Sequence, residues 1–413
     1  MDIGSKLHQL LRKSQKYTGT DNVYLARGGF WLALGQIVAT AIAFLSAVAF
    51  ANLLDPTTYG NYKYILSLLG ILGIFSLDGI GSAVTQAVAR GLEGSFYTGF
   101  KIKLKWGLLG SLAAIGGAIY YLIRGNNLMP IPLLISAFFI PLMYASQIYG
   151  AFLNGRKLFN VQVNYGIVNQ IVSAGAIITA LFFTKNVFWL IAVYFVSHTI
   201  LNYSFYLFTK IKFRPNKEED VKTIGYAKHL SLMSVINYVA TFLDKILLFN
   251  FIGPAQLAIY SFALLIPEQI KGLTDNLNTL AYPKLAQRPR EEIKANMMKR
   301  FWKLALLAAV IVSLYIAIVP FFFKIFFPQY LSSVKYSQVY MLTLVSFPSL
   351  IMATAFGAKM MKKELYLLRI VPLTRIVLFS ILIPLFGIWG AVAAEIGGEI
   401  VSLSLILFLF RKF

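Results

Sequence analysis

The stretch "ANLLDPTTYGNYKYI" (Ala51–Ile65) has a counterpart in "FNFIGPAQLAIYSFAL" (Phe249–Leu264). In both, an apolar segment ends in a two-residue turn that closes with Pro. Five residues separate that Pro from a Tyr, and a second apolar segment follows. The same corner therefore occurs twice, about half a chain length apart. This predicts a protein built from two halves with the same helical plan.

The composition is that of a membrane protein. Of the 413 residues, 58% are hydrophobic and 13% are charged, whereas a soluble domain carries about 25% charged residues. Apolar runs of about 18 residues or more, long enough to cross a bilayer as a helix, recur along the chain. The chain has no Cys, which excludes disulfides, thiol nucleophiles and Cys-based metal sites.

Twelve membrane-spanning helices are predicted, so the expected fold class is an all-α polytopic membrane protein. Gly, Pro and Asn mark most of the junctions between the helices. The predicted spans are residues 30–53, 62–80, 106–123, 131–152, 161–183 and 187–208 in the first half, and 230–251, 259–280, 302–323, 339–356, 368–385 and 389–409 in the second.

Lys and Arg are distributed unevenly between the two sides of this plan. The N-terminus, every second loop and the C-terminus carry 30 of the 38 basic residues, the other loops carry 5, and 3 lie within spans. Basic loops remain on the cytoplasmic side of a membrane. The net charge of +22 therefore needs no nucleic acid as a partner. The pattern predicts a multi-pass protein of the cytoplasmic membrane with both termini in the cytoplasm.

The longest polar stretch, "TKIKFRPNKEEDVKTIGYAKH" (Thr209–His229), lies near the middle of the chain. We predict four parts: a cytoplasmic amphipathic segment suited to an anionic membrane surface (1–29), a lobe of spans 1–6 (30–208), a cytoplasmic linker (209–228) and a lobe of spans 7–12 (229–413). Because six is even, both lobes enter the membrane in the same direction and form parallel repeats. Transporters built in this way bind their substrate near the midplane between the halves.

Charged side chains within the spans are the candidate substrate-binding or coupling residues. Each costs at least about 2.5–3.5 kcal/mol at the centre of a membrane helix, so such residues are usually functional. The candidates are Arg27 at the mouth of span 1, Asp78 near the inner end of span 2, and, in the second half, Asp244, Lys245, Glu268, Lys271, Asp275, Arg375, Glu395 and Glu399.

A structural role remains open for several of these charges. Glu268, Lys271 and Asp275 share one helix face by their spacing, so they could form a self-neutralising stripe that only joins helices. Asp244 and Lys245 could neutralise each other in the same way. Glu395 and Glu399 could line an outer vestibule.

Motifs for catalysis are missing from the sequence. There is no G-x-x-x-x-G-K-[ST] phosphate loop, the three His residues are scattered, and no H-E-x-x-H occurs. No external loop in the twelve-span plan is long enough to hold the site of a glycosyltransferase. We therefore predict no enzyme, no catalytic residue, no metal site and no bound cofactor. Coupling to H⁺ or Na⁺ is left open.

Four segments resemble the polysaccharide flippases of the multidrug/oligosaccharidyl-lipid/polysaccharide (MOP) exporter superfamily, in particular the O-antigen, Wzx-type members. The segment at the corner between spans 11 and 12 is the most specific of the four, and the likeness extends over essentially the whole chain. The segments are "ARGGFWLALGQIV" (Ala26–Val38), "LLDPTTYGNY" (Leu53–Tyr62), "FLNGRKLFNVQVNYGIVNQI" (Phe152–Ile171) and "LIPLFGIWGAVAAEIGGEIV" (Leu382–Val401).

The resemblance implies a MATE-like fold with two lobes and a central cavity lined by spans 1, 2, 7 and 8. It implies that the protein moves a polyprenyl-(pyro)phosphate-linked oligosaccharide across the cytoplasmic membrane by alternating access. Membrane lipid, and the glycosyltransferases and polymerase of the same pathway, would be its partners. Arg27 matches a basic residue at the mouth of span 1 and would contact the lipid-linked phosphate, because Arg binds phosphate through two parallel hydrogen bonds. Ordinary anchoring at the membrane surface is an equal alternative for Arg27.

A cation-coupled multidrug or toxic-compound antiporter on the same fold is the alternative function. The spans of the second half hold five acidic and three basic candidates, and an anionic pyrophosphate would prefer the reverse. In the antiporter, Asp244, Glu268 or Asp78 would bind the coupling cation. A scaffold for glycosyltransferases is a third interpretation, but a scaffold has no need of charges within the membrane.

Overall fold

The computed structural model describes residues 22–77 and 79–413, without the side chains of residues 22–29, 32, 221–230, 232–233, 275–284, 286 and 287. Three predicted site positions are affected. Asp78 lies outside the described residues, and so do the side chains of Arg27 and Asp275. Most of the predicted N-terminal amphipathic segment also lies outside them. The described part consists of helices and contains no β-strand, which confirms the all-α fold class.

Helices fill both halves of the described chain. Those of the first half are α2 (Asn22–Leu53), α3 (Pro56–Leu72), η1 (Gly73–Ser76), α4 (Gly79–Ala89), α5 (Ser95–Ile123), α6 (Pro130–Ser146), α7 (Ile148–Gly155), α8 (Phe159–Phe183) and α9 (Val187–Phe213). Those of the second half are α10 (Val221–Ile252), α11 (Pro254–Gln287), α12 (Arg290–Phe326), η2 (Pro328–Tyr330), α13 (Ser333–Met341), η3 (Leu342–Ser346), α14 (Phe347–Ala358), α15 (Lys362–Leu367) and α16 (Ile370–Arg411).

Every predicted span coincides with one of these helices or with a broken helix. Span 2 corresponds to α3, η1 and α4, span 4 to α6 and α7, and span 10 to α13, η3 and α14. Spans 11 and 12 are the two arms of α16, which bends at Gly387, where φ is 57° and ψ is −128°. Only residues 214–220 separate α9 from α10, fewer than the predicted linker holds. The division into two lobes at this linker stays a prediction.

Length and apolar composition alone identify fewer spans. In the described residues, nine helices are long and apolar enough to cross a membrane, and α3 with α4 would make a tenth. One of the nine, Lys362–Arg411, contains the bend at Gly387 and so holds two of the predicted spans. The charged residues Glu268, Lys271 and Asp275 lower the hydropathy of α11, which is not among the nine.

The two corners that are similar in sequence are also similar in structure. Asp55 caps α3 by accepting a hydrogen bond from the Thr58 N–H at 3.0 Å, and Pro56 is the first residue of the helix. At the second corner, Gly253 takes a φ of 90° and Pro254 begins α11. Proline suits this position because its fixed φ is helical and the first helical N–H needs no partner. Each corner thus ends one helix and starts the next within two residues.

The corners also lie against each other. A Cβ on Gly60 would fall 1.9 Å from the carbonyl oxygen of Pro254, so only glycine allows this approach of α3 to α11. Next to this contact, the ring of Tyr59 lies 4.9 Å from that of Phe262, and the ring of Tyr64 stacks on Phe249 at 3.7 Å between centroids. The two halves are therefore joined at the end of the molecule where the corners lie.

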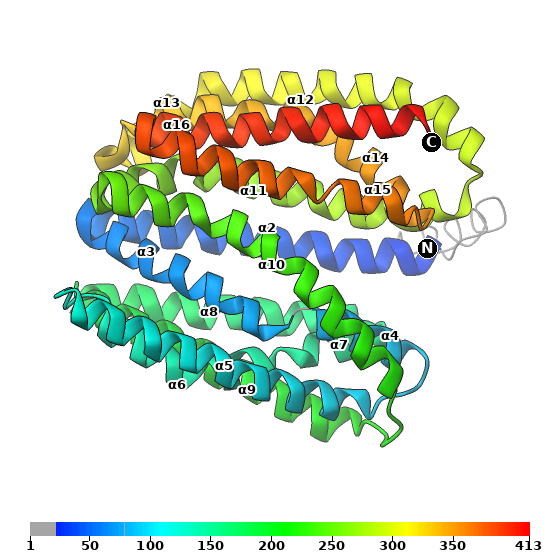
Figure 1. Cartoon of the computed structure of the whole chain (residues 1–413), viewed down its shortest axis with the longest axis horizontal. Helices are drawn as coiled ribbons and strands as arrows, with labels where there is room; N and C mark the ends of the chain where they lie inside the picture. Colours follow the sequence, from blue (N-terminus) through cyan, green and yellow to red (C-terminus); the bar gives the residue numbers. More distant parts are fainter. Residues whose placement is uncertain (1–21, 78) are drawn as a thin grey trace, which may run out of the picture.

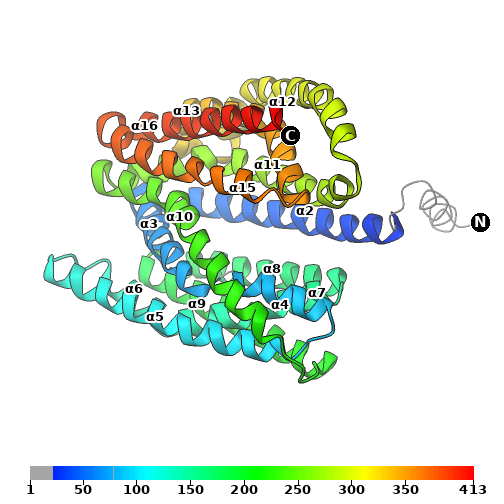
Figure 2. The same ribbon diagram turned by 45° about the vertical axis from the view of Figure 1, so that its right-hand side comes forward.

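The helices form two groups (Figure 1). Helices α4 to α9 make one group and α11 to α16 the other, with α2, α3 and α10 running between them. Figure 2 shows the same division from a second direction. Helix α10 packs on α16 of the second group and on α3 and α4, while α11 packs on α3 and α2 packs on α8.

The buried apolar side chains form one core that joins the halves and two that do not. The largest core contains residues of both halves, among them Tyr62 and Tyr260 near the corners. The second is made by first-half residues only, such as Phe96 and Phe152. The third is made by second-half residues only, such as Phe301 and Phe410. The halves thus share a core at the corner end and have separate cores at the opposite end.

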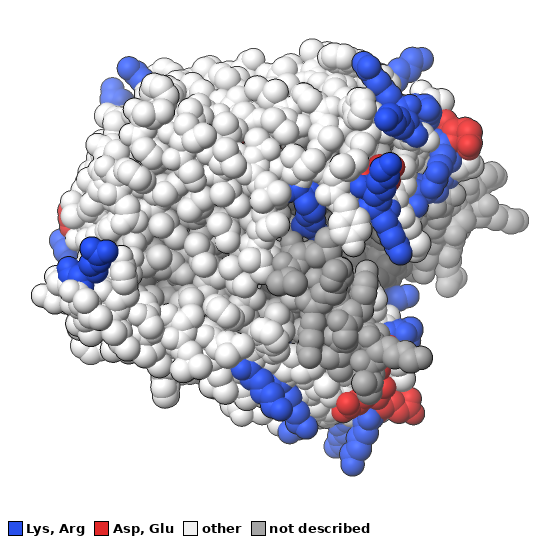
Figure 3. Space-filling model, in the orientation of Figure 1, with Lys and Arg blue, Asp and Glu red and all other residues white. Residues whose placement is uncertain are grey.

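Basic side chains gather at this opposite end. In Figure 3, Lys and Arg cluster at the end where the C-terminus lies in Figure 1, and fewer lie at the corner end. This end is the one that the predicted topology assigns to the cytoplasm.

Candidate functional site

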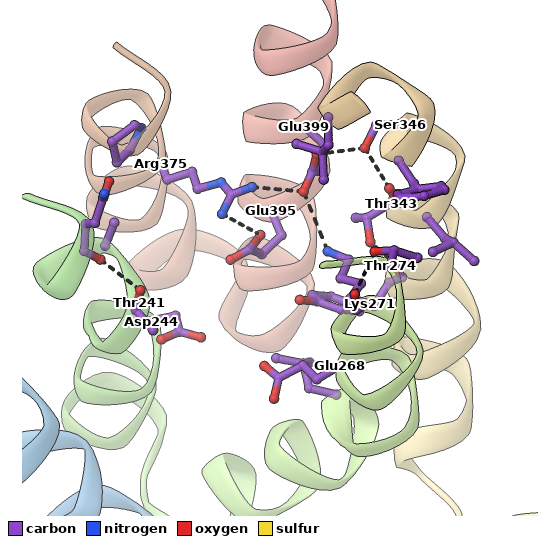
Figure 4. A pocket seen from close by; sticks show the side chains of 18 of the residues that line it. Thr241, Asp244, Glu268, Lys271, Thr274, Thr343, Ser346, Arg375, Glu395 and Glu399 are labelled. Atoms are coloured by element: carbon purple, nitrogen blue, oxygen red, sulfur yellow. Dashed lines mark hydrogen bonds and ion pairs between the residues drawn. The ribbon is translucent and has the colours of Figure 1, made fainter. Parts of the chain in front are cut away.

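A charged cavity of about 450 Å³ lies among helices of the second half (Figure 4). It is lined by residues of α10, α11, α13, η3, α14 and α16. Seven predicted candidates line it, four acidic and three basic: Asp244, Lys245, Glu268, Lys271, Arg375, Glu395 and Glu399. The structure therefore brings together every second-half candidate except Asp275, whose side chain lies outside the described part.

Arg375 occupies the centre of the largest ion-pair network in this cavity. Its guanidinium lies 2.9 Å from the Glu399 carboxylate and 3.6 Å from that of Glu395. Lys271 of α11 approaches the same Glu399 oxygen at 3.6 Å, and Ser346 donates a hydrogen bond to the other oxygen at 2.7 Å. Glu395 and Glu399 thus point into the cavity.

Asp244 belongs to a second group in the same cavity. Its side chain is almost fully buried, and it accepts a hydrogen bond from the Tyr260 hydroxyl at 2.8 Å. Lys245 reaches back along the helix to the same carboxylate, with its ammonium nitrogen 3.3 Å away. Tyr260 is the tyrosine of the second corner, so this corner positions a hydrogen-bond donor for the Asp244 carboxylate.

Glu268 differs from the other acids of the cavity. Among the described side chains it makes no hydrogen bond or ion pair, although Lys245 and Lys271 line the same space. When all seven charged groups are ionised, the cavity carries one negative charge more than it has positive charges. A carboxylate that has no fixed partner in such a place is free to bind a proton, a metal cation or a substrate hydroxyl group.

A second pocket of about 330 Å³ lies between first-half helices and α10. Its lining comes from α3, α6, α9 and α10 and includes Lys63 and Lys245 but no acidic residue. We call it the two-lysine pocket. Lys245 lines both this pocket and the charged cavity, so the two spaces adjoin at that side chain. Gly70 makes room for α10 here, because an added Cβ would lie 2.4 Å from the ring of Phe242.

Lys63 is the residue that the sequence analysis missed. Span 2 was predicted to begin at Tyr62, so Lys63 stood at its outer edge and was counted with the external loops, not among the candidates. The structure corrects this: α3 begins at Pro56, so Lys63 lies two turns into the helix. The signal was present in the sequence, since proline directly after Asp is a typical helix start.

The charged cavity also differs from the cavity that the resemblance implied. Spans 1 and 2 were expected to line the site with spans 7 and 8. The charged cavity is lined by α10 and α11, which correspond to spans 7 and 8, but by no residue of α2, α3 or α4 within the described part. Helix α3 contributes instead to the two-lysine pocket.

The family of the chain follows from comparison with known sequences. The profile of a family described as "Polysaccharide biosynthesis protein" matches residues 25–288. The chain belongs to this family. The match begins in α2 and ends just after α11, so it includes both corners and the whole two-lysine pocket. No curated protein sequence matches the chain significantly.

Solved structures share the fold of this chain. An inward-facing multidrug resistance MATE transporter of the MOP superfamily superposes with a TM-score of 0.69 at 13% identity, over 91% of this chain and 93% of that one. The lipid II flippase MurJ, in an inward closed conformation, gives a TM-score of 0.68 at 15% identity, over 92% and 87%. An outward-facing MATE transporter gives 0.62 at 13% identity, over 94% and 95%. The sequence match thus shows the family, these structures confirm the MATE-like fold, and the chain is a multi-pass membrane protein.

Proposed function

We propose that the protein translocates a polyprenyl-(pyro)phosphate-linked oligosaccharide across the cytoplasmic membrane, with both of its termini on the cytoplasmic side. The observation that carries this proposal is membership of the polysaccharide biosynthesis family over residues 25–288. The fold is shared with MurJ, which is a lipid II flippase. In such a protein no covalent bond is made or broken, so the charged groups serve binding and coupling rather than catalysis.

The arrangement of the cores supports alternating access as the mechanism. The halves share a core at the corner end and have separate cores at the basic end, which suits a state that is closed outside and open to the cytoplasm. Transporters with parallel repeats work by rocking one half against the other. For export, the contact of Gly60 with Pro254 would have to separate.

The two-lysine pocket suits the phosphate part of the substrate. Lys63 and Lys245 face the same space from opposite halves, and phosphate oxygens form strong charge-assisted hydrogen bonds with ammonium groups. Rocking of the halves would move one lysine away from the other and weaken the grip on the phosphate. Arg27, at the start of the same family match, remains a candidate for the first contact.

The charged cavity suits coupling to a cation. Glu268 has no partner among the described side chains, and Asp244, Glu395 and Glu399 are close enough to share the cavity with it. Binding of H⁺ or Na⁺ at Glu268 would cancel the excess negative charge of the cavity. We propose this as the step that the ion gradient drives.

The same acids favour the antiporter as the second candidate function. Four of the seven charged residues in the cavity are acidic, which suits a cationic drug better than a pyrophosphate. The two-lysine pocket argues the opposite, because no acidic residue lines it.

Reconstitution into liposomes distinguishes the two functions. A fluorescent polyprenyl-pyrophosphate oligosaccharide is loaded into both leaflets, and the label of the outer leaflet is reduced by dithionite. We expect purified protein to expose the inner-leaflet label, and Lys63→Gln to slow this exposure. Inner-leaflet label that stays protected from dithionite in the presence of folded protein would contradict the flippase. Export of a cationic dye from liposomes with an H⁺ or Na⁺ gradient would then support the antiporter. Empty liposomes and Lys335→Gln, an exposed lysine of α13, are the controls.

A further inference from the structure

An apolar slot of about 230 Å³ lies at the basic end of the second half, away from both cavities described above. It is formed by the end of α11, the start of α12 and α14. Leu285, Met297 and Phe301 are buried in its walls. The slot is smaller than the roughly 300–1,000 Å³ of a typical small-molecule site. Its size and its apolar lining suit part of a single hydrocarbon chain.

Two arginines, Arg288 and Arg300, line this slot beside its apolar residues. Arg300 lines the slot together with Met297, Phe301 and Leu304 of α12, which occupy positions i−3, i+1 and i+4 and cover about 100° of the helix surface. Arg300 is exposed, and within the described part it makes no hydrogen bond or ion pair. Arg288, the other arginine, pairs with Glu292 at 2.9 Å, with both side chains well exposed. One guanidinium at the slot is therefore left available for an anion.

The residues of α12 beside the slot are those typical of a membrane interface. The uninterrupted apolar part of α12 begins at Leu304, after Lys303. Trp302, just before it, is 66% exposed, and tryptophan is enriched where hydrocarbon meets headgroups. One turn beyond Leu304 on the same face, Leu307 is 55% exposed. An occupant could thus run from the slot along α12 toward the hydrocarbon, with its charged end at Arg300.

We propose that this slot holds one acyl chain of an anionic phospholipid, whose phosphate pairs with Arg300. The apolar walls match the chain, and the unpaired guanidinium matches the phosphodiester, which it can bind through two parallel hydrogen bonds. The lipid would bridge α11, α12 and α14 at the end where the second half has its own separate core. The inference does not depend on which substrate the protein transports.

Binding of two lipids that differ only in the headgroup tests this site. Full-length protein in detergent is titrated with phosphatidylglycerol or phosphatidylcholine of identical acyl chains, and bound lipid is counted by mass spectrometry under non-denaturing conditions. We expect phosphatidylglycerol to bind more tightly. Arg300→Gln should weaken the binding of phosphatidylglycerol about tenfold, the effect of one lost charge-assisted hydrogen bond. It should weaken the binding of phosphatidylcholine less, because the choline charge of that lipid offsets the phosphate that both lipids carry.

Lys299→Gln is the matched control. It removes the same charge from the neighbouring position of α12, which points about 100° away from Arg300 on the side opposite Phe301 and does not line the slot. Leu304→Trp fills the slot and should weaken the binding of both lipids. An unchanged melting temperature would show that this variant is folded. Equal binding of the two lipids, or equal effects of Arg300→Gln and Lys299→Gln, would overturn the proposal. A dimer that Leu304→Trp dissociates would overturn it as well, because the slot would then hold a second copy of the chain.

Discussion

Arg375 and Glu399, 24 residues apart in α16, are held 2.9 Å from each other because the helix folds back at Gly387. Gly390 allows the two arms to close up, since an added Cβ would lie 2.0 Å from the carbonyl oxygen of Leu382. Gly398 makes room for the side chain of Arg375 in the same way. The hairpin thus fixes the ion pair at the wall of the charged cavity.

Loss of Arg375 should destabilise the protein. In Arg375→Gln, Glu395 and Glu399 keep their negative charges and lose their closest cation. We expect the cost to be smaller than the roughly 3–5 kcal/mol found for fully buried pairs, since the side chain is partly open to the cavity. The double variant Arg375→Gln with Glu399→Gln should recover part of the lost melting temperature, which a double-mutant cycle measures. Lys363→Gln, an exposed change in α15, is the control. Additive effects of the two single changes would show that the pair contributes nothing.

Glu268 should be separable from the ion pairs around it. Because it has no fixed partner among the described residues, Glu268→Gln should leave the melting temperature nearly unchanged. We expect it to abolish the dependence of transport on the H⁺ or Na⁺ gradient, whereas Glu399→Gln should lower stability. Transport by Glu268→Gln that still follows the gradient would remove this residue from the coupling step.

Lys271 tests whether the charged cavity works as a unit. It is shared between Glu399, at 3.6 Å, and the face of the Tyr340 ring, at 4.7 Å from the centroid. Lys271→Ala should reduce transport while expression stays normal, because the cavity gains a further net negative charge. Unchanged transport in proteoliposomes would assign Lys271 a purely structural role.

Gly60 should control the outer corner. In Gly60→Ala the new Cβ would meet the Pro254 carbonyl at 1.9 Å, so the corners must move apart, at a cost of about 1–3 kcal/mol. Because the chain has no Cys, Ser261→Cys supplies a single buried thiol next to the corner. We expect a maleimide to label it faster with Gly60→Ala than without it. Gly81→Ala, where the Cβ would meet open space, should have no effect, and equal labelling in all three proteins would show that Gly60 does not keep the corner closed.

Glu93 should make stability depend on pH. Its carboxylate, between α4 and α5, binds the Arg156 guanidinium through two contacts of 2.6 Å, and this hydrogen bonding holds its pKa below the usual value despite partial burial. A lowered folded-state pKa stabilises the protein above the unfolded pKa of about 4.3, and this contribution is lost as the pH falls further. The melting temperature of the wild type should exceed that of Glu93→Gln near neutral pH, and the difference should shrink below about pH 4.5. A difference that does not change with pH would rule out the ionised pair as its cause.

The helical plan could be predicted from the sequence because strong local signals mark it. Proline after Asp55 and after Gly253 starts two helices, Gly387 separates two others, and the basic loops give the alternation of sides. The charged candidates of the second half could be identified from the sequence, since charges stand out in apolar helices, and seven of them line one cavity. Their grouping could not be predicted, because these helices are apolar on all sides and the sequence does not say which faces meet.

Lys63 and Tyr260 show the limit of this kind of reading. Lys63 was misplaced by one error of six residues in a helix start. Tyr260 was noted only as part of a repeated corner, although its hydroxyl binds Asp244. An aromatic residue in an apolar helix gives no sign in the sequence that a carboxylate lies beside it.

The hairpin of α16 has a consequence for how the protein is made. Arg375, Glu395 and Glu399 all lie on one hairpin, whose two arms follow each other directly in the chain. A lone charge of this kind costs about 2.5–3.5 kcal/mol on transfer into a bilayer. Because the hairpin carries its own counter-ions, much of that cost is cancelled before it meets any other helix. The hairpin can therefore enter the lipid as a single unit with one net negative charge and dock onto α10 afterwards.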